Sequence, residues 1–138
     1  MEGFNFFIPC TVRAADINYG GHVSNAVVLN YFQDARISYL QQVGGFSELD
    51  IGGRGIILSE AHLYFRAEMF LGDRLVIRAK VSELRHSVFV LDYRIERDGE
   101  TTAEGTTNLV TYDYQKRKPV RLPDEFRQAV AIFERSET

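Results

Sequence analysis

The chain has 138 residues, of which 45% are hydrophobic and 25% are charged, and its formal net charge at pH 7 is −3. This length and composition predict one globular domain over residues 1–138, and the mild acidity argues against a general nucleic-acid binder or a membrane-surface binder. Cys10 is the only cysteine, which excludes an intrachain disulfide and a multi-cysteine zinc site. The opening sequence MEGFNFFIPC lacks the basic and long apolar segments of a secretory signal, so we expect a cytoplasmic protein.

The first predicted element is a strand over residues 6–15. Pro9 cannot donate a hydrogen bond to a neighbouring strand, which favours an edge position or a strand start. The ten residues that follow, DINYGGHVSN at 16–25, form a polar turn that contains two glycines. A helix that starts directly after such a turn presents unpaired N–H groups and the positive end of its dipole. This arrangement suits a carbonyl oxygen, an oxyanion or a phosphate.

The second predicted element is a helix over residues 25–43, with Ser24 or Asn25 as its N-cap. Gly44 and Gly45 are expected to end the helix, because glycine is the usual residue just past a helix C-terminus. Apolar residues cover most of the helix circumference, which indicates a helix that is buried in a core and wrapped by other elements. The run also contains charged residues and is too mixed to span a bilayer.

Four strands with alternating patterns are predicted over residues 56–67, 73–84, 87–97 and 101–115. Their connections are short, so neighbouring strands are expected to be antiparallel, and Asp98-Gly99 is a strong hairpin signal. A short C-terminal helix is predicted to start at Pro123. This order of elements predicts an α+β fold in which a long, twisted antiparallel sheet wraps around one central helix.

The turn and the helix after it resemble the hotdog-fold thioesterases, in the branch of 4-hydroxybenzoyl-CoA thioesterase and the acyl-CoA thioester hydrolases. In that family the turn reads like D-x-D-x-x-G-H-V-N-N and the helix continues to (E/D)-A-R. The present sequence has DINYGGHVSN at 16–25 and DAR at 34–36. The segments YFRAEMFLGDRLVIRAKV and EGTTNLVTYDYQKRKPVRLP resemble the later strands of the family, so the resemblance covers roughly residues 8–127.

The resemblance implies a hotdog fold and hydrolysis of an acyl-CoA or acyl-carrier-protein thioester, with no metal and no bound cofactor. It also implies a homodimer, often assembled further into a tetramer, whose sheets join edge to edge. The active sites would lie at the dimer interface, with the thioester near the N-terminus of the helix. One position departs from the family, because Asn18 stands where the usual catalytic carboxylate is found. An asparagine can be neither a carboxylate nucleophile nor a general base.

Five residues of the turn and the helix are the catalytic candidates: Asn18, His22, Arg36, Asp16 and Gly21. Asn18 is expected to orient the attacking water or to donate to the thioester oxygen, and the alternative is a turn asparagine bonded to its own backbone. His22 suits acid–base chemistry. Arg36 suits polarisation of the carbonyl by a fixed cation, as in hotdog thioesterases of polyketide pathways, which this case resembles and which are thought to pair an asparagine with a helix arginine.

The backbone of the turn supplies the candidate oxyanion donors, a role that contributes about 10²–10³ in rate. These donors are the N–H groups of Gly20, Gly21, His22 and Val23. The alternative is a tight turn whose glycines only make room. Asp16 is either a substitute base or a structural cap of the turn.

Eight further residues are the substrate-binding candidates: Tyr19, Asn25, Asp34, Ser59, Glu60, Arg85, Lys116 and Arg117. Asp34 lies on the helix that is predicted to be buried, where a charge needs a partner, and the alternative role is an ion pair at a dimer interface. Glu60 is a candidate to replace the catalytic carboxylate that is absent at position 18. The alternative is a strand residue that faces solvent. Arg85 and the basic run at 115–118 suit the phosphates of CoA. The alternative is that these charges lie in solvated loops and bind no ligand.

Two other functions remain open from the sequence. A hotdog dehydratase usually pairs a histidine with a helix carboxylate, and His22 and Asp34 are present here but do not match the usual spacing well. A non-catalytic module that binds acyl-CoA is the second alternative, and the asparagine at position 18 supports it.

Overall fold

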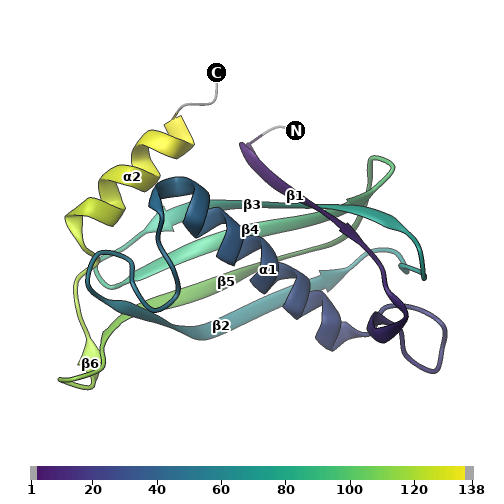
Figure 1. Cartoon of the computed structure of the whole chain (residues 1–138), viewed down its shortest axis with the longest axis horizontal. Helices are drawn as coiled ribbons and strands as arrows, with labels where there is room; N and C mark the ends of the chain where they lie inside the picture. Colours follow the sequence, from purple (N-terminus) through teal and green to yellow (C-terminus); the bar gives the residue numbers. More distant parts are fainter. Residues whose placement is uncertain (1–2, 136–138) are drawn as a thin grey trace.

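The computed structural model describes residues 3–135, which form one antiparallel sheet and two α-helices (Figure 1). The elements in chain order are β1 (Phe6–Thr11), a 3-10 helix η1 (Ala14–Asp16), α1 (Asn25–Gly44), β2 (Gly55–Phe65), β3 (Arg74–Leu84), β4 (Val88–Arg97), β5 (Glu100–Asp113), β6 (Lys118–Pro119) and α2 (Asp124–Arg135). The strand order is β1-β3-β4-β5-β2, with β6 paired to β5, and every pair is antiparallel. The predicted α+β class is confirmed, as is the edge position of the strand that contains Pro9.

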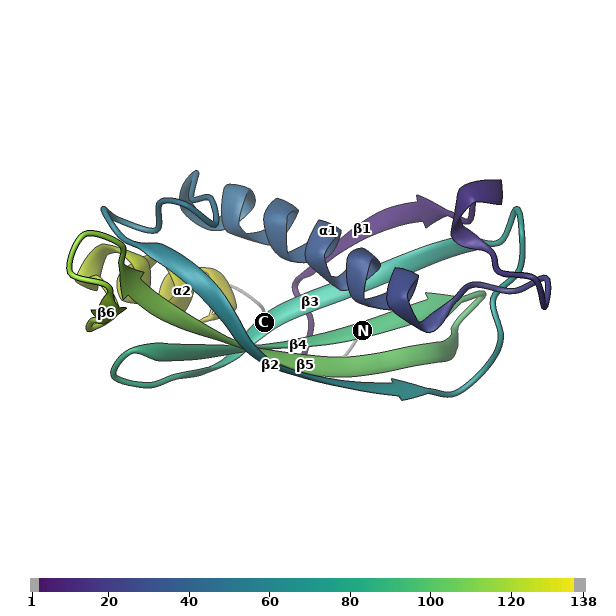
Figure 2. The same cartoon turned by 90° about the horizontal axis from the view of Figure 1, so that it is seen from below.

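Helix α1 lies across one face of the curved sheet, and the described part of the chain places no helix on the other face (Figure 2). Strand β4 illustrates this arrangement, because its side chains toward α1 are apolar and buried, whereas those on the opposite face include charged residues. Phe89, Leu91 and Tyr93 are buried on the side of α1, while Val90 is buried and Asp92 and Arg94 are half-buried on the opposite face. A strand that alternates in this way stabilises a sheet with one packed and one solvated face.

The helix is exposed on the side away from the sheet, so the prediction that it is buried all round is wrong for the single chain. Ile37 is 45% exposed, and Asp34, which was expected to be a buried charge, is exposed as well. Asp34 therefore stays solvated and needs no buried partner. The physical reason is that the sheet covers only one face of α1, with α2 packed at its C-terminal end.

The local signals at the element ends are confirmed. The Ser24 side chain caps α1 by accepting a hydrogen bond from Val27 N at 3.4 Å. Gly45 ends the helix with a φ of +69°, a left-handed conformation that costs glycine little. Asp98 and Gly99 both have positive φ, of 52° and 83°, which is the geometry of the two-residue hairpin that joins β4 and β5.

The connection between β2 and β3 does not make a hairpin, although its length suggested adjacent strands. Strand β2 pairs with β5 and forms an edge of the sheet, whereas β3 pairs with β1 and β4. The connecting residues 66–73 instead contact the turn before α1. Val23 N donates to Met69 O at 2.8 Å, and His22 and Phe70 form an isolated β-bridge. This contact places the segment after β2 beside the N-terminus of α1.

Across residues 3–135, neither helix combines the length and the apolar character that crossing a membrane requires.

Candidate active site

The turn before α1 is a small closed loop held by its own backbone. Asn18 N donates to His22 O at 3.0 Å, and Gly21 N donates to Asn18 O at 3.0 Å. Gly20 N donates to Asn18 Oδ1 at 2.9 Å, which is the hydrogen bond of an Asx turn. Gly21 has a φ of +84°, so a residue with a side chain would be strained there. The Asn18 side chain thus has a structural hydrogen bond in this turn, and a role in the reaction stays a prediction.

The backbone N–H groups around the turn differ in whether they are already paired. Those of Gly20 and Gly21 donate within the loop, and that of Val23 donates to Met69 O. The N–H groups of His22, of Asn25 and of the next residue along α1 have no hydrogen-bond acceptor among residues 3–135. The first N–H groups of a helix carry the positive end of its dipole. The available donors to a developing oxyanion are therefore His22 N and the first amides of α1.

A cavity of about 260 Å³ opens beside these free N–H groups. Its lining residues are His22, Val23, Asn25, Val28, Phe65, Arg66, Ala67, Glu68 and Met69. Val23, Val28 and Met69 are almost completely buried, so they form an apolar floor. His22, Asn25 and Glu68 are more exposed and give the cavity a polar side. An apolar pocket with a few convergent polar groups is the usual form of a small-molecule site.

His22 joins the polar side of the cavity to the segment after β2. Its Nδ1 lies 3.3 Å from Val23 O, and its Nε2 lies 3.7 Å from Glu68 Oε2. The side chains of His22 and Glu68 are 35% and 63% exposed. The ring is therefore fixed on one side by a backbone carbonyl and faces a carboxylate on the other.

Asp16 lies under the turn and is almost completely buried. Its Oδ2 accepts hydrogen bonds from Tyr31 Oη at 2.8 Å and from Arg13 N at 3.0 Å. Burial alone would raise the pKa of Asp16, but these donors and the nearby Arg13 guanidinium lower it overall. Asp16 thus caps η1 and fixes α1 to the turn as an ionised carboxylate.

We expect Tyr31→Phe to lower the free energy of unfolding by about 1–2 kcal/mol at pH 7, because a buried carboxylate loses one donor. The pKa of folded Asp16 lies below its ordinary value of 3.8, so its stabilising contribution is present above that pH. The contribution is lost as the pH falls through the folded pKa. Urea unfolding at pH 7 and pH 3 should show the difference between wild type and variant shrinking at low pH. A difference that stays constant over this range would contradict the assignment.

Arg36 is buried on the sheet side of α1. Its Nε donates to Glu48 Oε2 at 2.5 Å and one terminal nitrogen donates to Tyr93 Oη at 3.0 Å. Tyr93 Oη in turn lies 2.6 Å from Thr107 Oγ1. These contacts join α1, the loop after it, β4 and β5. A catalytic role for Arg36 stays a prediction beside this structural one.

Ser59 and Glu60 lie away from the cavity because of a β-bulge in β2. The pairing with β5 shifts between Leu58 and Glu60, and Ser59 Oγ donates to Asn108 O at 3.2 Å. Glu60 pairs with Asn108 and not with the buried Leu109, so its side chain lies on the sheet face opposite α1. There its Oε1 lies within hydrogen-bond distance of His62 Nε2, at 2.9 Å.

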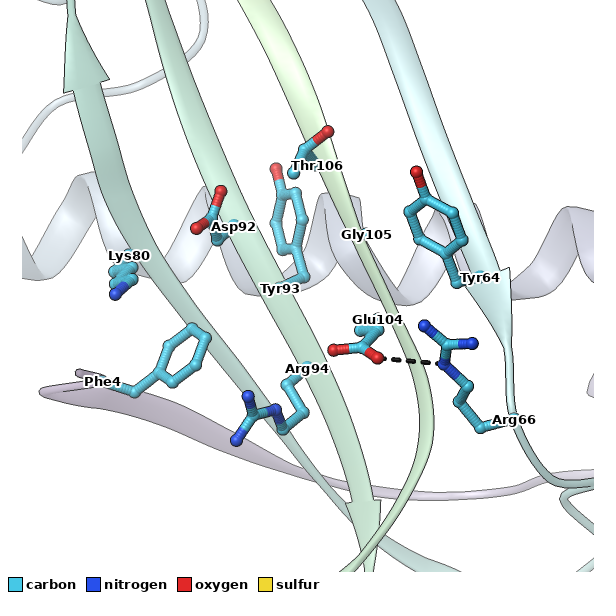
Figure 3. A pocket seen from close by; sticks show the side chains of 10 residues that line it. All are labelled: Phe4, Tyr64, Arg66, Lys80, Asp92, Tyr93, Arg94, Glu104, Gly105 and Thr106. Atoms are coloured by element: carbon cyan, nitrogen blue, oxygen red, sulfur yellow. Dashed lines mark hydrogen bonds and ion pairs between the residues drawn. The ribbon is translucent and has the colours of Figure 1, made fainter. Parts of the chain in front are cut away.

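A second cavity, of about 390 Å³, lies on this opposite face of the sheet. Figure 3 shows its charged side chains with α1 behind the strands. Arg66 Nε forms an ion pair with Glu104 at 3.0 Å, and the Arg66 guanidinium lies 5.4 Å from the centre of the Tyr64 ring. The mixture of paired charges on a solvated sheet face does not form a catalytic constellation.

The remaining predicted residues are spread over the molecule. Tyr19 is fully exposed at the tip of the turn. Arg85 forms an ion pair with Glu83 at 2.5 Å. Lys116 and Arg117 lie in the hairpin between β5 and β6, at the opposite end of the sheet from the turn (Figure 1). Of the predicted residues, His22 and Asn25 line the cavity, and the Asn18 side chain lies close to His22 in the turn, with both side chains next to Gly20.

The segment after β2 brings to the site residues that were not predicted from the sequence. Phe65, Glu68 and Met69 line the cavity, although more than forty positions separate them from His22 in the sequence. The motif YFRAEM did suggest the end of a strand, but only the bridge between His22 and Phe70 reveals what it packs against.

A six-stranded antiparallel sheet with one long helix across its face, and a polar turn at the N-terminus of that helix, defines the hotdog class. The model of the thioesterase-like superfamily matches residues 12–130 of the chain. The chain therefore belongs to the thioesterase-like superfamily.

Individual relatives agree with this assignment. The acyl-CoA thioesterase YbgC of Haemophilus influenzae is 26% identical over 93% of this chain and 94% of that protein. The chloroplast acyl-acyl carrier protein thioesterase ATL3 of Arabidopsis thaliana is 29% identical over 94% of this chain and 70% of that protein. A crystal structure of a thioesterase from Thermus thermophilus, complexed with coenzyme A and Zn, superposes with a TM-score of 0.87 at 28% identity and covers all of both chains.

Proposed function

We propose that the protein hydrolyses acyl thioesters of coenzyme A or of an acyl carrier protein in the cavity at the N-terminus of α1. The observation that carries this proposal is the set of unpaired N–H groups at His22 and Asn25 beside an apolar pocket. The thioester carbonyl oxygen would accept hydrogen bonds from these groups as it becomes negative, while the acyl chain enters the apolar pocket. A thiolate is a good leaving group, so the reaction needs a positioned water and an oxyanion site more than a strong acid.

We also propose that two copies of the chain share the site through β2. This strand is an edge of the sheet, and it exposes large apolar side chains: Ile57 at 39%, Leu58 at 41%, Tyr64 at 51% and Phe65 at 48%. An exposed apolar edge favours pairing with another strand. Two-fold symmetry makes the paired edges antiparallel when the strand pairs with itself, so two sheets would become one.

The dimer would also give the basic hairpin a role. Antiparallel pairing of two β2 strands places the start of one beside the end of the other. The hairpin at residues 113–118 lies next to the start of β2, and the cavity lies at its end. Lys116 and Arg117 of the partner subunit would then approach the mouth of the cavity, where the phosphates of a bound CoA would emerge. Arginine and lysine suit that contact.

Free-thiol release from acetyl-, octanoyl-, palmitoyl-, isobutyryl- and benzoyl-CoA and from an acyl carrier protein loaded with octanoate tests both proposals. We expect turnover of at least one substrate, with specific activity falling on dilution as the shared site dissociates. No turnover on any of them, together with binding detected by thermal shift, would instead support a non-catalytic binding module. Unchanged specific activity down to concentrations at which the chain is monomeric would contradict the shared site. Tetramer formation and a cytoplasmic location stay predictions of the sequence.

A further inference from the structure

The reaction proposed above needs a group that accepts a proton from the attacking water, and position 18 holds an asparagine. Two nearby carboxylates are unsuited to this task. Asp16 is buried and accepts hydrogen bonds from Tyr31 and Arg13, and Glu60 lies on the other face of the sheet. Among the described residues, Glu68 is the one carboxylate that lines the cavity at the N-terminus of α1.

From this geometry we infer that Glu68 and His22 together hold the attacking water and that His22 accepts its proton. The inference rests on the thioesterase reaction proposed above. It assigns Glu68 as the carboxylate that takes over the function lost at position 18, and places it on a different element, the segment after β2.

The main chain fixes Glu68 toward the cavity. Its carbonyl oxygen accepts a hydrogen bond from an Arg97 terminal nitrogen at 2.8 Å. The two residues before it, Arg66 and Ala67, both donate their N–H groups to Thr102 O, at 2.8 Å and 3.1 Å. The nearby Arg66 guanidinium pairs with Glu104, so it does not neutralise Glu68. The Glu68 carboxylate is left to face His22.

The His22 ring is oriented for the same task. Its Nδ1 lies 3.3 Å from Val23 O, an acceptor that favours the tautomer with the proton on Nδ1. Its Nε2 then carries a lone pair and lies 3.7 Å from Glu68 Oε2, which is too long for a direct hydrogen bond. A water oxygen at about 2.8 Å from both atoms fits this separation. It would donate one hydrogen to each acceptor and keep its lone pairs free for attack.

The resulting step balances with these two side chains. The water oxygen forms a bond to the thioester carbonyl carbon as one water proton moves to His22 Nε2. The carbonyl oxygen becomes an oxyanion at the N–H groups of the helix N-terminus. When the carbonyl re-forms, the carbon–sulfur bond breaks and the departing thiolate takes the proton from His22. The products are a carboxylic acid and a free thiol, and the Glu68 carboxylate stabilises the transient imidazolium.

Glu68→Gln tests the inference because the substitution keeps the shape and removes the charge. The Glu68 side chain is 63% exposed, so the variant should fold with an almost unchanged melting temperature. On the panel thioester with the highest wild-type kcat/KM, we expect kcat to fall at least about tenfold with KM within about twofold, since general acid–base groups contribute about 10²–10⁴. Glu68→Asp should recover part of the loss. Glu125→Gln, at an exposed glutamate in the first turn of α2, should keep the wild-type kcat.

His22→Ala completes the test. If the two side chains act on one water, the kcat of the double variant His22→Ala/Glu68→Gln should be no lower than that of His22→Ala alone. Wild-type kcat in Glu68→Gln, with an active wild type, would overturn the inference and leave the thioesterase proposal standing. A wild-type protein that is inactive on every thioester of the panel would overturn both.

Discussion

Gly105→Ala is expected to lower the free energy of unfolding by about 3 kcal/mol or more, a fall in Tm of about 10 °C. A methyl group at position 105 would lie 2.2 Å from His62 O and 2.8 Å from the Phe32 ring. The first contact is with the backbone of β2, which cannot move without loss of its pairing with β5. The second is with α1, whose Phe32 ring stacks on Tyr93 with centroids 4.5 Å apart. The absence of a side chain at Gly105 therefore allows β2 and α1 to pack closely against β5.

Thermal unfolding followed by circular dichroism measures this effect. Thr106→Ala is the matched control, because it is the next residue of β5 and its half-buried side chain faces away from the core. The control should change the free energy of unfolding by less than about 1 kcal/mol. A Gly105→Ala protein as stable as wild type would show that β2 and α1 are not packed at position 105 as described.

Arg36→Met is the second large effect that we expect, at about 3 kcal/mol of lost stability. Arg36 is buried and donates to Glu48 and Tyr93. Removing one member of a buried ion pair leaves the other charge uncompensated and costs about 3–5 kcal/mol. The Glu48 side chain is 30% exposed, so partial solvation places the expected value at the low end of that range.

The double variant Arg36→Met/Glu48→Gln separates pairing from catalysis. It should recover part of the stability, because no unpaired charge remains. Urea unfolding measures this recovery, and thiol release from the same samples measures the activity of the folded protein. The structural role predicts that kcat per folded molecule stays within a few-fold of wild type. A variant of wild-type stability that has lost tenfold or more in kcat would favour the catalytic role predicted from the sequence.

Local signals were sufficient to predict most of the fold. The Ser24 cap, the Gly45 stop, the Asp98-Gly99 hairpin and the alternation of β4 all depend on neighbouring residues. Each of these signals depends on residues that are close together in the chain, so the sequence alone is enough to predict the caps, the hairpin and the strand. The order of the strands in the sheet was not predicted, because a short connection such as 66–73 can join adjacent strands or cross to a distant one.

The candidate site was less predictable, and β2 shows why. Leu58 pairs with the buried Leu109, so strict alternation would place Glu60 on the same face, toward α1. The extra residue at the bulge, Ser59, turns Glu60 to the opposite face. A one-residue change of register reverses every later side chain of a strand, and the sequence has no clear signal for this bulge.

Glu68 was not predicted as a site residue, for a different reason. Its position beside His22 results from the contact between residues 66–73 and the turn before α1. That contact joins segments more than forty residues apart, and no local pattern encodes it. Asp34 was predicted to be buried and is exposed. Its exposure depends on which face of α1 the sheet covers, and this is again a contact between segments that are distant in the sequence.

Thiol release by Asn25→Pro, compared with Asn25→Ala, tests most directly whether the N-terminus of α1 holds the oxyanion. Asn25 is the first residue of α1, and Ser24 before it is extended, with φ −77° and ψ 157°. Proline is favoured at the first helical position and requires an extended residue before it, so both variants should fold. Both lose the side chain, but only proline loses the N–H group. We predict that Asn25→Pro has a kcat at least about 100-fold below that of Asn25→Ala. Equal kcat values would contradict an oxyanion held by this amide at the N-terminus of α1.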